Sequence, residues 1–175
     1  YAFPQSLNKL YVDYKEYDEE TILNLLGRNY MKNNALYINK DYYVEISEDN
    51  VLTYARRGIL LGDNKMTTRD GENYAKEFLR SVNLYDDTVV LDTVAKESDY
   101  IVVNFKKVVK DRFVEKSYMT LKLFNNEVIS FERKWLSHES SDEESNQIIP
   151  LEMAVYKFES KINQSSNLMV TDILL

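Results

Sequence analysis

The sequence contains no cysteine among its 175 residues. This absence excludes disulfides, thiol nucleophiles and cysteine-ligated zinc sites. Only four glycines are present, and they form no glycine-rich phosphate loop. The sequence also lacks any run of roughly twenty apolar residues, so we predict no membrane-spanning helix within it.

Histidine is equally scarce, because His138 is the only one, and it lies beside Glu139 in an acidic, serine-rich stretch. We interpret it as a solvated surface residue. The neighbouring Asp142, Glu143 and Glu144 lack the alternating ligand spacing and central glycine of a calcium loop, so they are interpreted as a solvated charge run. We therefore predict that the chain is not an enzyme and has no catalytic, metal-binding or cofactor-binding residues.

Basic residues are fewer than acidic ones, with 22 lysines and arginines against 29 aspartates and glutamates. The net charge is −7 and the isoelectric point is near 4.9, which argues against nucleic-acid binding because phosphate neutralisation needs a concentrated basic face. Lys106, Lys107 and Lys110 form a short basic run, which we interpret as a solvated strand end.

Hydrophobic residues make up 44% of the chain and aromatic residues 13%, which is enough to bury a core. From Ile101 to Trp135 apolar residues alternate with polar ones, the period expected of strands with one buried face. We predict a hairpin with a three-residue loop, Phe124 to Asn126, because a two-residue loop would place odd positions opposite even ones. This loop pairs Leu121 with Ile129 and Met119 with Phe131.

The rest of the chain reads as helices alternating with strands. Periodicity and capping residues predict helices over 19–31, 67–82 and from Pro150 to Ile162, and strands over 42–46, 51–57, 88–94 and 169–175. Residues 138–147 are expected to form an exposed loop. The fold class is α+β, with antiparallel sheet and helices on one side. We expect a stem over 1–17, a helix-plus-hairpin unit over 18–57 and a larger helix-plus-antiparallel-sheet unit over 67–175. The sequence leaves open whether the strands of the two units form one continuous sheet or two packed sheets.

Aromatic residues fall into two groups. Phe105, Phe113, Phe131 and Trp135 have the spacing of core residues. The tyrosines Tyr11, Tyr14, Tyr17 and Tyr43 lie outside the main apolar stripes. We predict that these four tyrosines contact a partner, because tyrosine combines apolar area with a hydroxyl.

Two further segments stand out, residues 118–136, from Tyr-Met-Thr-Leu-Lys-Leu-Phe to Glu-Arg-Lys-Trp-Leu, and 148–154, Ile-Ile-Pro-Leu-Glu-Met-Ala. Both resemble the extracytoplasmic region of the YycI/YycH family of Gram-positive bacteria. The helix-strand-strand unit from Asp18 is similar more weakly. The chain departs from the family at residues 110–113, Lys-Asp-Arg-Phe, where relatives tend to carry a glycine and a proline.

This resemblance implies a single-pass protein of the cell membrane, with its membrane helix just upstream of Tyr1 and this region on the extracytoplasmic side. Its partners would be an essential sensor histidine kinase that controls cell-wall metabolism and a YycH-like protein. The rival hypotheses are a secreted or lipid-anchored PepSY-like inhibitor module and, less favoured, a hydrolase.

Overall fold

A computed structural model describes residues 6–14, 17–58, 60 and 62–147. The chain divides into two compact units. One comprises residues 1–11 and 138–175, and the other is Val12–Ser137. Strands β1 (Ser6–Tyr14) and β10 (Leu136–Gln147) pair in a two-stranded sheet, which supplies the described backbone of the first unit.

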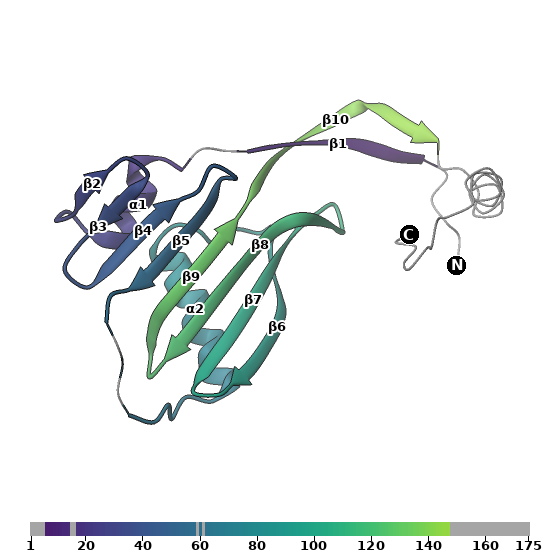
Figure 1. The fold of residues 1–175 in the computed structure, drawn as a ribbon. Helices are drawn as coiled ribbons and strands as arrows, with labels where there is room; N and C mark the ends of the chain where they lie inside the picture. The colour runs from purple at the N-terminus through teal and green to yellow at the C-terminus, as the bar shows by residue number, and fades with distance from the viewer. Residues whose placement is uncertain (1–5, 15–16, 59, 61, 148–175) are drawn as a thin grey trace, which may run out of the picture. The chain divides into compact units, whose positions relative to one another are not determined.

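The second unit is built on one eight-stranded sheet with the order β2-β3-β4-β5-β9-β8-β7-β6, and all its neighbouring strands are antiparallel (Figure 1). The strands are β2 (Met31–Asn33), β3 (Leu36–Ile38), β4 (Tyr42–Ile46), β5 (Val51–Arg56), β6 (Val89–Glu97), β7 (Tyr100–Val109), β8 (Arg112–Phe124) and β9 (Glu127–Lys134). The sheet therefore runs without interruption through the two groups of strands that the sequence predicts.

Helices α1 (Glu19–Leu26) and α2 (Thr68–Ser81) begin where the capping residues predict. Asp18 caps α1 by accepting a hydrogen bond from the backbone N–H of Thr21, and Thr67 forms a capping box with Asp70 at the start of α2. Helix α1 is shorter than predicted, because Gly27 ends it with a φ of +73°. That left-handed conformation is open to glycine, so the chain leaves the helix there and residues 31–33 become β2.

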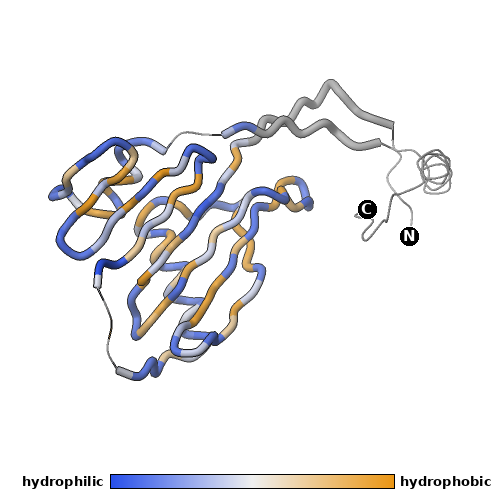
Figure 2. Tube along the Cα trace, viewed as in Figure 1, coloured by the Kyte–Doolittle hydropathy of each residue, from blue (hydrophilic) through white to orange (hydrophobic). Residues whose placement is uncertain are grey.

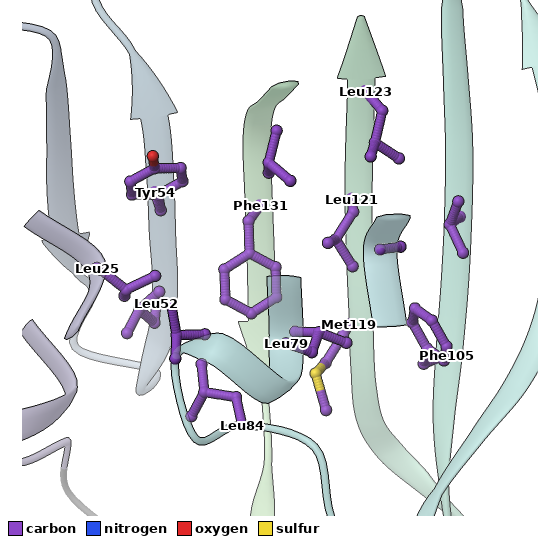
Figure 3. Packing of buried hydrophobic residues seen from close by; sticks show 14 of the residues in the cluster. Leu25, Leu52, Tyr54, Leu79, Leu84, Phe105, Met119, Leu121, Leu123 and Phe131 are labelled. Carbon is purple, nitrogen blue, oxygen red and sulfur yellow. The ribbon is translucent and has the colours of Figure 1, made fainter. Parts of the chain in front are cut away.

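The two helices share one hydrophobic core with the sheet, which confirms the α+β class. Buried residues of α1, α2 and strands β4 to β9 belong to a single cluster. In Figure 3, Leu79 of α2 lies beside Phe131, Leu121 and Met119 of the central strands, and Leu25 of α1 lies beside Leu52 of β5. Hydrophobic and hydrophilic residues interleave along these strands, as the period-two pattern predicts (Figure 2).

The turn between β8 and β9 corrects the predicted register. The loop has two residues, Asn125 and Asn126, both with positive φ, and Phe124 pairs with Glu127. A β-bulge then leaves Ile129 without a partner, so Leu121 pairs with Phe131 and Met119 with Arg133. The three-residue loop was wrong, because the bulge and not the turn shifts the parity that places these apolar residues on one face.

Two further predictions are wrong. Phe113 is not core but 61% exposed, because it follows the tight β7–β8 turn, whereas Phe105, Phe131 and Trp135 are buried as expected. Residues 138–147 are strand and not loop, because their backbone pairs with β1, a distant segment that local sequence does not reveal. The helix predicted from Pro150 and the strand predicted over 169–175 lie outside the described residues.

Asn64 fixes the connection into α2. Its side-chain amide donates to the carbonyl oxygens of Asp99 and Leu123, at 2.7 and 3.2 Å, and its side-chain oxygen accepts from the N–H groups of Met66 and Asn125, at 3.0 and 3.2 Å. This buried side chain therefore binds the connector to the β6–β7 and β8–β9 turns.

Gly71 sets how closely α2 approaches the sheet. A Cβ atom built at this position would lie 2.4 Å from Cγ2 of Ile101, a fully buried residue of β7. Glycine at this helix position therefore permits a helix-to-strand contact that any larger residue would push apart.

We expect Gly71→Ala to lower the free energy of unfolding by up to about 2 kcal/mol. Alanine gains about 1 kcal/mol in helix propensity, but overpacking against Ile101 costs about 1–3 kcal/mol. Urea unfolding measures the effect. In an Ile101→Ala background the same substitution should be neutral or stabilising, and an equal loss in both backgrounds would contradict the steric explanation.

Candidate functional site

A cleft of about 470 Å³ opens at the end of the large sheet where the β4–β5 turn lies. Two of the four tyrosines predicted to contact a partner, Tyr14 and Tyr17, line it. Its lining among the described residues is Tyr14, Tyr17, Ala35, Tyr37, Ile46, Ser47, Glu48 and Asn50. Aromatic rings and short polar groups therefore meet in one hollow, a composition typical of binding sites.

Two short hairpins build the base of this cleft. The N–H of Ile46 donates to the carbonyl of Ala35 at 3.0 Å and so ties the β4–β5 hairpin to the β2–β3 hairpin. In the β4–β5 turn, the N–H of Asn50 donates to the carbonyl of Ser47 at 2.9 Å, and the N–H of Val51 donates to the Ser47 hydroxyl at 3.2 Å. These bonds fix the backbone that carries Glu48.

Tyr17 forms the inner wall. Its hydroxyl donates to the carbonyl oxygen of Arg133 at 2.9 Å, and the Arg133 guanidinium carbon lies 5.4 Å from the centre of its ring. The ring packs against the hydrophobic core, and this burial raises the pKa of the Tyr17 hydroxyl above its usual value. Tyr17 is therefore held in place from behind.

Tyr14 precedes α1 in the chain, and Tyr37 follows it. Tyr14 is 49% exposed, and the ammonium of Lys134 lies 5.5 Å from the centre of its ring. Tyr37 packs against the core, meets Tyr30 edge-on at 5.8 Å and has the Lys32 ammonium 5.2 Å from its ring centre. The cleft thus joins one accessible tyrosine to two supported ones.

A cation–aromatic stack continues behind the cleft. The guanidinium carbon of Arg133 lies 5.4 Å from the centre of the Tyr17 ring and 5.2 Å from that of the Trp135 ring. The ammonium of Lys107 lies 5.6 Å from the centre of the same Trp135 ring. Lys107 is only 4% exposed and donates to the carbonyl oxygen of Leu136 at 2.5 Å. Burial lowers the pKa of both Lys107 and Arg133.

The sequence analysis did not predict the stacking of Lys107 and Arg133 on Trp135. Lys107 was interpreted as part of a solvated strand end, and this was wrong, because its side chain faces the core side of β7 beside Phe105 and is covered by Trp135 and Leu136. The period-two pattern contained the signal, since Lys107 continues the odd set Ile101, Val103 and Phe105.

The other two candidate tyrosines do not join the cleft. Tyr43 pairs with Ile38 and Ala55, and its neighbour Val44 faces the helix-covered core, so Tyr43 faces the opposite side of the sheet. Tyr11 belongs to β1, and its side chain lies outside the described residues. The side chains of His138, Asp142, Glu143 and Glu144 lie outside them as well.

A second polar cluster links β4, β5 and β9. Both the Tyr42 hydroxyl and the Arg56 guanidinium donate to the same carboxylate oxygen of Glu127. Tyr42 also stacks on Tyr54 with ring centres 4.8 Å apart. Because these contacts tie three strands together, we assign the cluster a structural role.

Within the described residues, no group of three or more acidic or histidine side chains is placed to hold a metal ion. Among the same residues, no helix is long and apolar enough to cross a membrane. Comparison of the chain with known protein families, curated proteins and solved structures found no match.

We expect the protein to lose stability as the pH rises from about 10 to about 12, partly through Tyr118. Its hydroxyl donates to Glu132 at 2.6 Å, and this bond raises its pKa to about 12. Below pH about 10, Tyr118 is protonated in both the folded and the unfolded protein. Between pH about 10 and about 12, the unfolded chain releases this proton while the folded protein keeps it, and this difference favours unfolding. Urea unfolding across this pH range measures the slope.

Tyr118→Phe is the matched variant, because it removes only the hydroxyl. Its stability should fall less steeply over the same pH range than that of the unmodified chain. Parallel slopes for the two proteins would contradict the assignment to Tyr118.

Proposed function

We propose that this chain is the extracytoplasmic part of a membrane-anchored regulator of the YycI/YycH type, which binds a sensor histidine kinase controlling cell-wall metabolism. The proposal rests first on the resemblance of residues 118–136 and 148–154 to that family. In this proposal a helix upstream of Tyr1 anchors the protein, and a YycH-like protein joins the complex.

The tyrosine cleft is the observation that carries the proposed mode of action, which is protein–protein contact. Tyrosine is enriched at the energetically important centres of protein interfaces. Tyr14 offers an accessible ring at the mouth, whereas Tyr17 and Tyr37 are held against the core, so a partner would meet a largely preformed surface. Preformed contacts lose less conformational entropy on binding and so favour affinity.

The predicted anchor separates this function from its rival. A single apolar helix of roughly twenty residues encoded just upstream of Tyr1, after a short basic segment, would favour the membrane-anchored regulator. A lipobox cysteine or a cleavable signal there would favour a secreted or lipid-anchored PepSY-like inhibitor module instead. Reading the gene upstream of Tyr1 decides between them.

We expect Tyr14→Ser to weaken binding to the extracytoplasmic region of the kinase about fivefold to thirtyfold, because truncating an accessible aromatic anchor costs about 1–2 kcal/mol. Tyr14 is half exposed, so the fold should be unaffected. Isothermal titration calorimetry with the purified partner region measures the affinity, and thermal unfolding checks the fold.

Tyr43→Ser is the matched control, since it removes the same side chain from the opposite face of the sheet. Its affinity should stay within about twofold of the unmodified chain. If Tyr43→Ser weakens binding and Tyr14→Ser does not, the partner binds the other face and the cleft is not the contact site.

A further inference from the structure

We infer that the tyrosine cleft takes an extended acidic segment of a partner protein, with one apolar side chain among the tyrosines and carboxylates at the rim. This inference deepens the proposed function and rests on it, because it assigns the cleft to partner contact. It adds the chemistry of what is bound.

The first observation is that each tyrosine of the cleft has a cation against its ring. Lys134 accompanies Tyr14, Arg133 accompanies Tyr17 and Lys32 accompanies Tyr37, at 5.5, 5.4 and 5.2 Å from the ring centres. Three cation–aromatic contacts of the described residues therefore involve rings of this one cleft, in a chain with a net charge of −7.

The second observation is that no carboxylate oxygen of the described residues lies within ion-pair distance of these cations. Among the described residues, Lys32, Arg133 and Lys134 form no ion pair, whereas Arg56, Lys76 and Lys106 do so elsewhere. Among the described residues that line the cleft, Glu48 is the only charged one, and the three cations lie against its tyrosine rings. An acidic segment would supply the missing counter-charges.

Arg133 contributes most to this argument. Its Nε atom is buried without a hydrogen-bond partner in the described structure, and its guanidinium is held between the Tyr17 and Trp135 rings. Arg133 is half-buried and Asp86 partly offsets its charge, so only part of its field reaches the cleft across the Tyr17 ring.

The third observation concerns the apolar component. Ala35, Tyr37 and Ile46 give the cleft an apolar base, and its volume of about 470 Å³ accommodates an aromatic or branched aliphatic side chain with its adjoining backbone. The site therefore favours an acidic segment that contains one large apolar residue over a purely polar polyanion.

Two synthetic peptides of equal length test the inference. One places a phenylalanine between pairs of aspartate and glutamate, and the other places it between lysines. Titration of the isotopically labelled chain, followed by two-dimensional NMR, detects binding up to millimolar dissociation constants. We expect saturable shifts at residues 35–37 and 46–50 with the acidic peptide, and at least tenfold weaker binding of the basic one.

A second experiment reverses the charge of Lys32 and Lys134, the two lysines that contact the rings of the cleft. Lys32→Glu combined with Lys134→Glu should weaken binding of the acidic peptide roughly tenfold, and high salt should reduce this difference by screening. The control combines Lys96→Glu with Lys122→Glu, which changes the net charge equally at two exposed positions outside the cleft. This control should leave the affinity unchanged.

The outcomes separate the inference from the proposed function. Equal binding of both peptides, no binding of the acidic one, or equal losses in the two double variants would overturn the acidic-segment inference. The kinase region could still depend on Tyr14 in that case, and the proposed function would stand. If the acidic peptide binds the cleft but neither Tyr14→Ser nor the rim variants change the affinity for the kinase region, the proposed function is contradicted and the inference stands.

Discussion

The pairing of β5 with β9 is the contact on which the rest of the second unit depends. It joins the strands that follow α1 to those that follow α2, and it places Tyr54 opposite Phe131 and Leu52 opposite Arg133. Through this register the cores under the two helices merge into one cluster. It also brings the end of β9 beside the β4–β5 turn, since Val51 pairs with Lys134, and this is where the cleft forms.

The cleft and the core are therefore not independent. Phe131 and Arg133 face the same side of β9, where Phe131 fills the core and Arg133 continues it as a cation between aromatic rings. Arg133 is half-buried, and the Tyr17 and Trp135 rings lie 5.4 and 5.2 Å from its guanidinium carbon. The same residue holds Tyr17, which lines the cleft, so a residue that completes the core also supports the site.

Much of the fold could be predicted because its signals are local. Asp18 and Thr67 mark helix starts by their own hydrogen bonds, and alternation marks the long strands. The register of β8 and β9 could not be predicted in the same way. The bulge at Ile129 is decided by how Leu121, Phe131 and the residues of α2 pack together, which alternation along one strand does not contain.

For the candidate site, the sequence by itself determined that tyrosines outside the apolar stripes were available for contact, because residue type and period are properties of the chain. Only the tertiary structure decided that Tyr14 and Tyr17 share a cleft while Tyr43 faces the other side of the sheet. It also decided that Lys107 and Arg133 stack on Trp135. These contacts join residues far apart in the chain, so they depend on strand pairing, which no local pattern specifies.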